Sequence, residues 1–244
     1  DYADFVMQTD DVVGQIIDAI DTNNLAEETI VIFTSDNGCS KAADIDELAK
    51  KGHRVSGPYR GSKADLWEGG HRVPFLARWP GEIPPRSHTS QTICITDFFA
   101  TLADLLIDDI PEKAAEDSVS FLSAFYGQPI VSDRTGLIHS SISGHFGYRM
   151  NQWKLLLARG SGGWTAPKES AAKQQELPPY QLYNMATDPT ESQNLGSEQR
   201  DIAHKMYTLL RTDIEQGRST TGPESTNDAE PIKLWKSGSP TPDL

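Results

Sequence analysis

Two polar residues that could bind a metal ion follow closely after an apolar run. Residues 30–33 read Ile-Val-Ile-Phe, and Asp36 and Asn37 come just beyond them. Such a run predicts a strand buried on both faces, and ligands of open α/β sheets bind beyond the carboxyl ends of the strands. Carboxylate and amide oxygens are hard ligands of the kind that calcium and magnesium prefer. Asp-Asn-Gly is also ordinary turn chemistry, so this stretch by itself leaves both a turn and a metal site open.

A cationic, glycine-rich segment at residues 57–74 offers a second set of chemical groups. Lys63 lies in it with glycines on both sides, which would let the backbone approach a ligand closely. Lysine supplies a mobile point charge for a tetrahedral anion. A metal ion bound by oxygen ligands next to this lysine would form a site for a phosphate or sulfate ester. The metal ion and the lysine ammonium would together stabilise the negative charge that develops during hydrolysis. Alternatively, Glu68 and its neighbouring glycines only shape a turn, and Arg72 only pairs with a carboxylate.

Two histidines and two arginines near this segment are further candidates. His53 and His71 flank the lysine, and the ordinary pKa of histidine would allow either one to contact substrate or to protonate a leaving group. A surface or packing role is the alternative for both. Arg54 and Arg60 could bind a second anionic group of the substrate.

The charge distribution limits the class of partner. The formal net charge is −13, from 22 basic and 35 acidic residues, which argues against nucleic acid as a partner. Residues 50–78 hold seven of the basic residues and only two of the acidic ones, so an acidic body carries one basic segment. This clustering predicts a local anion site, with a solvated charged loop as the alternative. No apolar run approaches the roughly 18 residues of a membrane span.

Hydrophobic periodicity predicts an α/β arrangement in the first half of the chain, followed by antiparallel strands and a final helix. The first half contains a predicted helix at 4–24, a strand at 29–34, a short helix within 45–51, strands at 73–79 and 92–95, and a helix at 98–107 with Asp97 at its first turn. The second half contains predicted strands at 137–143, 148–158 and 180–184, a surface loop at 161–176 and a helix at 197–216.

Several segments, in the same order and spacing, resemble the type I sulfatases of the alkaline phosphatase superfamily. Residues 30–38 resemble the second metal motif of this family, and residues 57–74 resemble its downstream lysine motif, which 79–84 continue. Further likeness lies at residues 96–98, 101–102, 149, 153–155, 182–184, 188–191 and 194–195. With gaps, the resemblance runs from about residue 4 to about residue 210.

The resemblance implies a fold and a division of the chain. The expected fold class is α/β, with part of an alkaline-phosphatase-like mixed sheet flanked by helices and a smaller C-terminal subdomain of antiparallel sheet and helix. Residues 1–130 would be the C-terminal part of the catalytic domain, and residues 131–216 the subdomain. Residues 217–244, rich in Ser, Thr, Pro and Gly, would form a partly disordered tail.

The resemblance also implies roles for three residues. Asp36 and Asn37 would be two of the Ca²⁺ ligands, and Lys63 would contact the sulfate oxygens and the departing ester oxygen. The family's nucleophile is the hydrate of a formylglycine, made from Cys or Ser in a Cys/Ser-x-Pro-x-Arg motif. Neither Cys39 nor Cys94 begins that motif, and we expect the family's nucleophile to lie outside this sequence. The family's early Asp-Asp metal pair is missing, so we expect a C-terminal portion that is inactive alone.

Three functions stay open at this stage. The first is a sulfuric ester hydrolase acting on a sulfated small molecule or, preferably, a sulfated carbohydrate, with a periplasmic or secreted location implied by the family. The second is a phosphodiesterase or phosphonate hydrolase of the same superfamily. The third is a binding module that keeps the fold without catalysis. Two cysteines build no disulfide framework, and nothing in their spacing requires Cys39 and Cys94 to pair.

Overall fold

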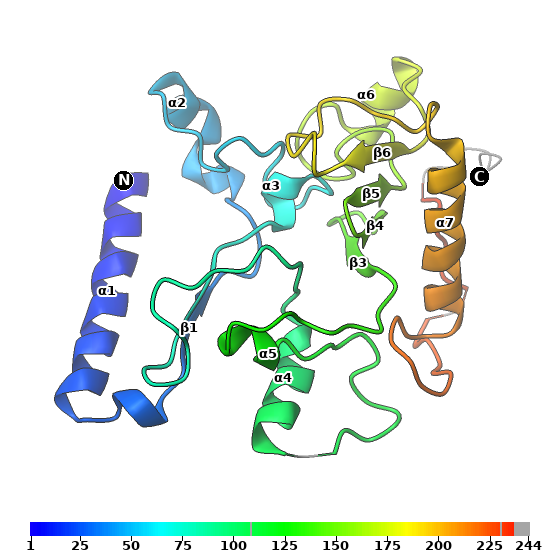
Figure 1. Cartoon of the computed structure of the whole chain (residues 1–244). Coiled ribbons are helices and arrows are strands. Elements are labelled where there is room, and N and C mark those ends of the chain that lie inside the picture. Colours follow the sequence, from blue (N-terminus) through cyan, green and yellow to red (C-terminus); the bar gives the residue numbers. More distant parts are fainter. Residues whose placement is uncertain (108, 230, 237–244) are drawn as a thin grey trace.

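The computed structural model describes residues 1–107, 109–229 and 231–236. Figure 1 shows a helix and a two-stranded sheet on one side of the molecule and a four-stranded sheet with a long helix on the other. The elements of the first half are α1 (Tyr2–Thr22), η1 (Ala26–Glu28), β1 (Val31–Thr34), η2 (Lys41–Ala43), α2 (Ile45–Lys50), α3 (Glu68–His71), β2 (Phe75–Arg78), α4 (Asp97–Leu106) and α5 (Leu122–Phe125). Those of the second half are β3 (Leu137–Ser140), β4 (Phe146–Met150), β5 (Trp153–Leu156), α6 (Glu169–Gln174), β6 (Gln181–Asn184) and α7 (Arg200–Glu215).

The α/β fold class is confirmed, but β1 differs from its prediction. It pairs antiparallel with β2, in a register that sets Val31 opposite Arg78 and Thr34 opposite Phe75. All four of its residues are only half-buried, so the prediction of a strand buried on both faces is wrong for the described chain. The reason is that β2 is the only strand that pairs with β1 among the described residues.

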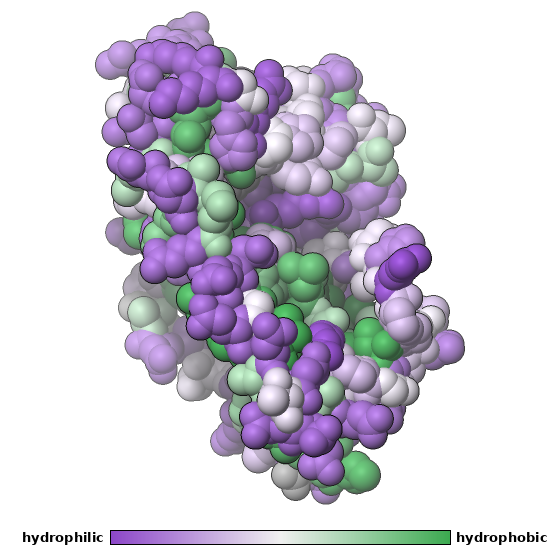
Figure 2. Space-filling view, turned by 90° about the vertical axis from the view of Figure 1, so that its left-hand side faces the viewer, coloured by the Kyte–Doolittle hydropathy of each residue, from purple (hydrophilic) through white to green (hydrophobic). Residues whose placement is uncertain are grey.

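Helix α1 confirms the predicted helix but buries none of its residues. Its apolar stripe arises from helical spacing, yet Phe5 is 69% exposed and Met7 70% exposed. Figure 2 shows that apolar residues reach the surface on this side of the molecule. None of the described helices is long and apolar enough to cross a membrane.

The second half forms its own core around an antiparallel sheet. The strand order is β3-β4-β5-β6, and α7 packs against β4 and β5. Tyr148 and Leu155 from the sheet meet Met206 and Leu210 from the helix, and all four are buried. The apolar stripe of α7 therefore covers one face of this sheet, as the helical and strand periodicities require.

The predicted strand at 148–158 is in fact two strands. A tight turn at Asn151, whose φ is 52°, separates β4 from β5. Asn tolerates this left-handed conformation, and the strand-like pattern continues on both sides of the turn, so periodicity alone could not show the break. The predicted strand at 92–95 does not form, because the Cys94 amide instead donates to the Asp97 carboxylate at 2.9 Å.

The remaining predicted elements agree in kind, and the described residues form three short α-helices beyond the predicted ones, α3, α5 and α6. The helices predicted within 45–51, at 98–107 and at 197–216 correspond to α2, α4 and α7, and the strand at 73–79 corresponds to β2. Helix α6 forms within the predicted loop at 161–176, and α3 forms where a turn was the alternative. The division of the chain at residue 130 stays a prediction.

The first part of the predicted tail is tied to the rest of the molecule. The Arg218 guanidinium donates to the carbonyls of Glu112 and Pro223, and Trp235 lies against Tyr207 of α7, with 5.8 Å between ring centroids. Residues 230 and 237–244 of this tail lie outside the described residues.

Candidate functional site

The turn after β1 leaves two oxygen donors free. Its shape is set by local hydrogen bonds: Ser35 Oγ donates to the Asn37 carbonyl at 2.9 Å, and Asn37 Nδ2 donates to the Gly38 carbonyl at 3.0 Å. The exposed Asp36 carboxylate and the Asn37 side-chain oxygen accept no hydrogen bond from any described residue. Both oxygens are therefore available to a ligand, and their chemistry suits Ca²⁺.

Lys63 lies directly beside this turn. Its backbone N–H donates to the Cys39 carbonyl at 3.0 Å, and the Gly38 N–H donates to the Gly70 carbonyl at 2.9 Å. The Lys63 side chain is half-buried. Within the part of the chain that the structure describes, its ammonium forms no ion pair or hydrogen bond. The structure thus brings together the two sequence motifs that were predicted to form one site.

The glycines of this region serve close packing between backbone segments. A Cβ at Gly38 would lie 1.8 Å from the Gly69 carbonyl oxygen, and one at Gly69 would lie 2.3 Å from the Gly61 carbonyl oxygen. A Cβ at Gly70 would lie 2.3 Å from the Asp65 carbonyl oxygen. Backbone atoms fill the space beside these three glycines, so a side chain would not fit there. Glycine is required at these positions for close backbone packing, and not for the close approach of a ligand that was predicted for the glycines of residues 57–74.

A buried ion network behind α3 was missed by the sequence reasoning. The ammonium of Lys154, which is 0% exposed, lies 2.9 Å from Glu68 Oε1 and 2.7 Å from Glu191 Oε1. The Arg72 guanidinium donates to Glu68 Oε2 at 3.1 Å, which confirms the alternative interpretation of Arg72. The resemblance had marked residues 153–155 and 188–191 but carried no role for either segment.

Burial and the nearby positive charges shift the pKa values of the two carboxylates of this network in opposite directions. Burial raises the pKa of Glu68, but Lys154 and nearby arginines outweigh that effect, so the pKa lies below its ordinary value. Burial raises the pKa of Glu191 despite the contact with Lys154. The physical cause is that one ammonium is shared by two desolvated carboxylates.

The predicted histidines have different surroundings. His71 Nε2 lies 2.9 Å from the Leu66 carbonyl and 3.0 Å from the Lys154 ammonium, and its ring lies 4.1 Å from that of His139. Burial, and then the Lys154 charge, hold the pKa of His71 well below 6.5, so its imidazole is neutral at pH 7. His53 is exposed, and its ring lies 5.7 Å from that of Tyr2.

The two predicted arginines also differ. The Arg60 guanidinium stacks 3.6 Å from the centroid of the Trp67 ring and donates to the Glu191 carbonyl at 3.1 Å. Arg54 is exposed. Among the described residues, no hydrogen bond or ion pair joins Lys63 to any of the predicted histidines and arginines. Their contacts with substrate therefore stay predictions.

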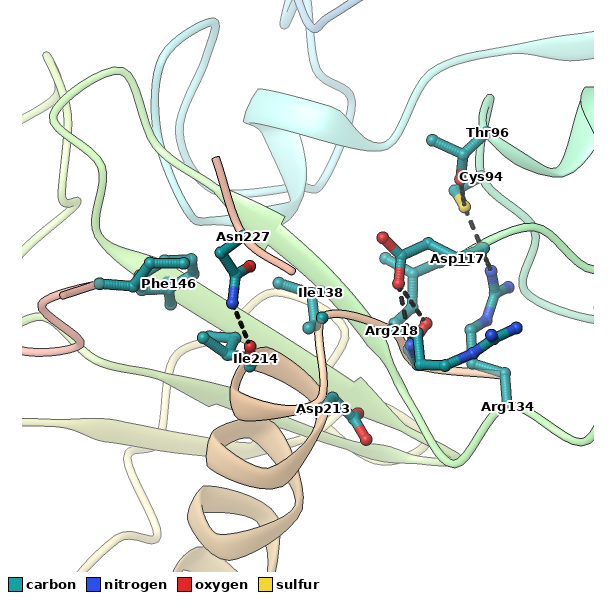
Figure 3. A pocket seen from close by; sticks show the side chains of 14 residues that line it. Cys94, Thr96, Asp117, Arg134, Ile138, Phe146, Asp213, Ile214, Arg218 and Asn227 are labelled. Carbon is teal, nitrogen blue, oxygen red and sulfur yellow. Dashed lines mark hydrogen bonds between the residues drawn. The ribbon is translucent and has the colours of Figure 1, made fainter. Parts of the chain in front are cut away.

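Cys39, beside the metal turn, and the distant Cys94 are both free thiols. A cavity of about 270 Å³ lies beside the end of α7, and Figure 3 shows Arg134 joined to Cys94 there, with Asp213 on the helix. Arg134 is paired with Asp97 at 2.7 Å, so its charge is already neutralised. No predicted site residue lines this cavity.

Comparisons with known proteins show similarity to sulfatases. The family model described as Sulfatase matches residues 1–108. An N-acetylgalactosamine-6-O-sulfatase from Bacteroides thetaiotaomicron is 30% identical over 215 residues, covering 86% of this chain and 41% of that protein. A steryl-sulfatase from Mus musculus is 36% identical over 141 residues, covering 57% of this chain and 22% of that protein. A solved structure from work on glycosaminoglycan metabolism by Bacteroides thetaiotaomicron superimposes with a TM-score of 0.71 at 30% identity, over 85% of this chain and 43% of that one.

The fold and the paired motifs define an α/β protein of the alkaline-phosphatase-like class. The chain belongs to the sulfatase family. It spans less than half the length of the relatives reported above, which is consistent with the expectation of a C-terminal portion. The reported relatives are sulfatases, so the phosphodiesterase alternative gains no support from them.

Proposed function

We propose that this chain is part of a sulfatase that hydrolyses a sulfate ester on a sulfated carbohydrate or small molecule. The observation that carries the proposal is the hydrogen bond from the Lys63 N–H to the Cys39 carbonyl. It joins the segment that carries the lysine to the turn that carries Asp36 and Asn37. The carbohydrate preference is supported by the 30% identical relative, which is named for a sulfated sugar. A tetrahedral sulfate group matches both halves of this arrangement.

Asp36 and Asn37 would hold Ca²⁺ through the carboxylate and the amide oxygen. Calcium takes six to eight oxygen ligands, and no group of three or more His, Cys, Asp or Glu among the described residues could hold a metal. We therefore expect these two residues to supply part of the site and this chain alone to bind calcium weakly. Bound Ca²⁺ would supply Lewis-acid stabilisation of negative charge on the sulfate. The formylglycine implied by the family would likewise come from outside this sequence.

Lys63 would contact the sulfate oxygens and the ester oxygen that leaves. Its half-buried position strengthens the interaction of the ammonium with developing charge. His71 and His53 remain candidates for proton transfer, and Arg60 and Arg54 for a second anionic group. His71 and Arg60 already contact protein groups, so each would have to serve both purposes. A periplasmic or secreted location, which fractionation would test, completes the proposal.

The proposal is tested by sulfate release from the full-length protein. Lys63→Ala should lower kcat by about 10²–10³-fold, the usual cost of losing one group that stabilises transition-state charge, and a calcium chelator should abolish activity. Lys51→Ala removes the same charge from an exposed position in the same basic segment and should leave kcat unchanged. The 244-residue chain alone is the negative control. Undiminished sulfate release after chelation or in Lys63→Ala contradicts the assignment.

A further inference from the structure

Asp65, two residues after Lys63, has a buried carboxylate that binds backbone N–H groups both of its own turn and of residues 164–165, which lie far away in the sequence. It is 3% exposed. Its Oδ2 accepts from the Ser62 N–H at 2.9 Å, and its Oδ1 accepts from the N–H groups of Trp164 and Thr165 at 2.8 and 3.0 Å. It forms no ion pair with any described residue. A buried carboxylate is costly unless hydrogen bonds satisfy it, and here three N–H groups do so.

The residues that follow Lys63 are held by the C-terminal half. The Leu66 N–H donates to the Ser161 carbonyl at 2.8 Å, and the Ala64 carbonyl accepts from the Ile142 N–H at 3.1 Å. Gly163 packs so closely that a Cβ there would lie 2.3 Å from the Ala64 carbonyl oxygen. The sequence prediction treated this partner segment as a surface loop, whereas the structure sets it against the lysine turn.

The backbone next to Lys63 is strained. Ala64 has a φ of 83°, a conformation that residues with a Cβ rarely adopt and that persists only where surrounding contacts impose it. Those contacts are the hydrogen bonds of Asp65 and the packing of Gly163. On the other side, Lys63 donates its N–H to Cys39 beside the metal turn, so the lysine is held between the two segments.

We propose that Asp65 is a positioning residue for Lys63. By binding Ser62 on one side and residues 164–165 on the other, the carboxylate keeps the turn in its strained shape and holds the Lys63 backbone beside the Asp36–Asn37 turn. This inference rests on the proposed sulfatase function and deepens it. Displacement of a catalytic group by about 1 Å can cost on the order of 10²-fold in rate, so the anchoring carboxylate should matter to catalysis without touching substrate.

The first test is Asp65→Asn in the full-length protein. The shape is kept, but the amide nitrogen must face either Ser62 or residues 164–165, so at least one hydrogen bond is lost. We expect kcat to fall by about 10-fold or more with KM nearly unchanged and the circular dichroism spectrum retained. Asp188→Asn is the matched control, because Asp188 also accepts backbone N–H groups, from Ser192 and Gln193 at 2.8 Å, in a turn without Lys63.

The decisive test repeats Asp65→Asn in a Lys63→Ala background. If the carboxylate acts through the lysine, the second substitution should lower kcat by less than about twofold, because coupled residues are not additive. Two outcomes would overturn the positioning role and leave the sulfatase proposal intact. One is that the loss of kcat in the double variant equals the product of the losses in the two single variants, and the other is a normal kcat in Asp65→Asn alone. No sulfate release by the wild type overturns both. If Asp65→Asn folds poorly, Thr165→Val, which removes the hydroxyl contact to Ser62 at 3.3 Å, should show a smaller effect on kcat with the same dependence on Lys63.

Discussion

Lys154 illustrates how one buried residue can join distant parts of the chain. Its ammonium comes from β5 and meets Glu68 of α3 and Glu191 of the loop after β6. Burying a charge without partners is strongly unfavourable, and a buried pair offsets this only when the geometry and remaining hydrogen bonds are good. Here the Glu68 N–H also donates to Glu191 Oε2 at 2.6 Å, so the three residues form one hydrogen-bonded unit.

Lys154→Met should therefore destabilise the protein more than the loss of one contact would suggest. The change removes the ammonium that the two desolvated carboxylates share, and among the described residues only Glu68 keeps cationic partners, Arg72 among them. We expect the free energy of unfolding in urea to fall by about 3–5 kcal/mol. Lys173→Met, at an exposed position on α6, is the control and should change it by less than about 0.5 kcal/mol. Equal stabilities of the two variants would show that the network contributes little.

Helix α3 is an element that only its neighbours can maintain. Four residues are far too few for a helix that is stable in isolation, and two of them are glycines, which disfavour helix. Contacts from outside hold it: the Gly38 N–H bonds to the Gly70 carbonyl, and the Gly69 N–H bonds to the Arg60 carbonyl at 2.7 Å. These contacts are also the ones that set the metal turn against the lysine segment.

Gly38→Ala and Gly14→Ala should have opposite effects on stability. At Gly38 the new methyl group would collide with backbone, so we expect a loss of about 1–3 kcal/mol. At Gly14, inside α1, nothing lies within 4 Å of a Cβ, and alanine should stabilise the helix by about 0.5–1 kcal/mol. The melting temperatures of the two variants give the comparison, and a neutral Gly38→Ala would contradict the close approach.

At the scale of the whole molecule, a pair of half-buried imidazoles lies where the two halves meet. His71 from α3 faces His139 from β3. Burial holds the pKa of both well below 6.5, with a further contribution from Lys154 for His71 and from His71 for His139. Both rings are therefore neutral in the folded protein at pH 7.

These imidazoles should make stability fall in mild acid. As the pH drops below about 6.5 the unfolded chain protonates both histidines, while the folded protein keeps them neutral. The unfolded state then binds more protons, so the free energy of unfolding decreases as the pH is lowered. We expect the melting temperature of the wild type to fall between pH 7 and pH 5.5, and His71→Gln to reduce that fall. His88→Gln, at an exposed position, should not, and an unchanged slope in His71→Gln would contradict the explanation.

The candidate site shows how much local sequence determines. Asp36, Asn37 and Lys63 could be selected from the sequence because metal-type ligands and a cation follow a strand and a glycine-rich turn. Helices α1, α4 and α7 follow from apolar spacing that depends only on nearby residues. The roles that the resemblance implied for Asp36, Asn37 and Lys63 stay predictions.

Tertiary structure alone decided which residues support that site. Two of the three N–H partners of Asp65 lie about 100 positions away, and Lys154 lies within an ordinary strand pattern. The sequence near these residues therefore does not indicate either set of contacts. Helix α3 forms although two of its four residues are glycines, which disfavour helix. The burial expected for β1 depends on neighbouring strands and not on the apolar run itself. Local spacing determined which groups could do chemistry, and long-range contacts decided how they are held, because packing and hydrogen bonding between distant segments leave no periodicity in the sequence.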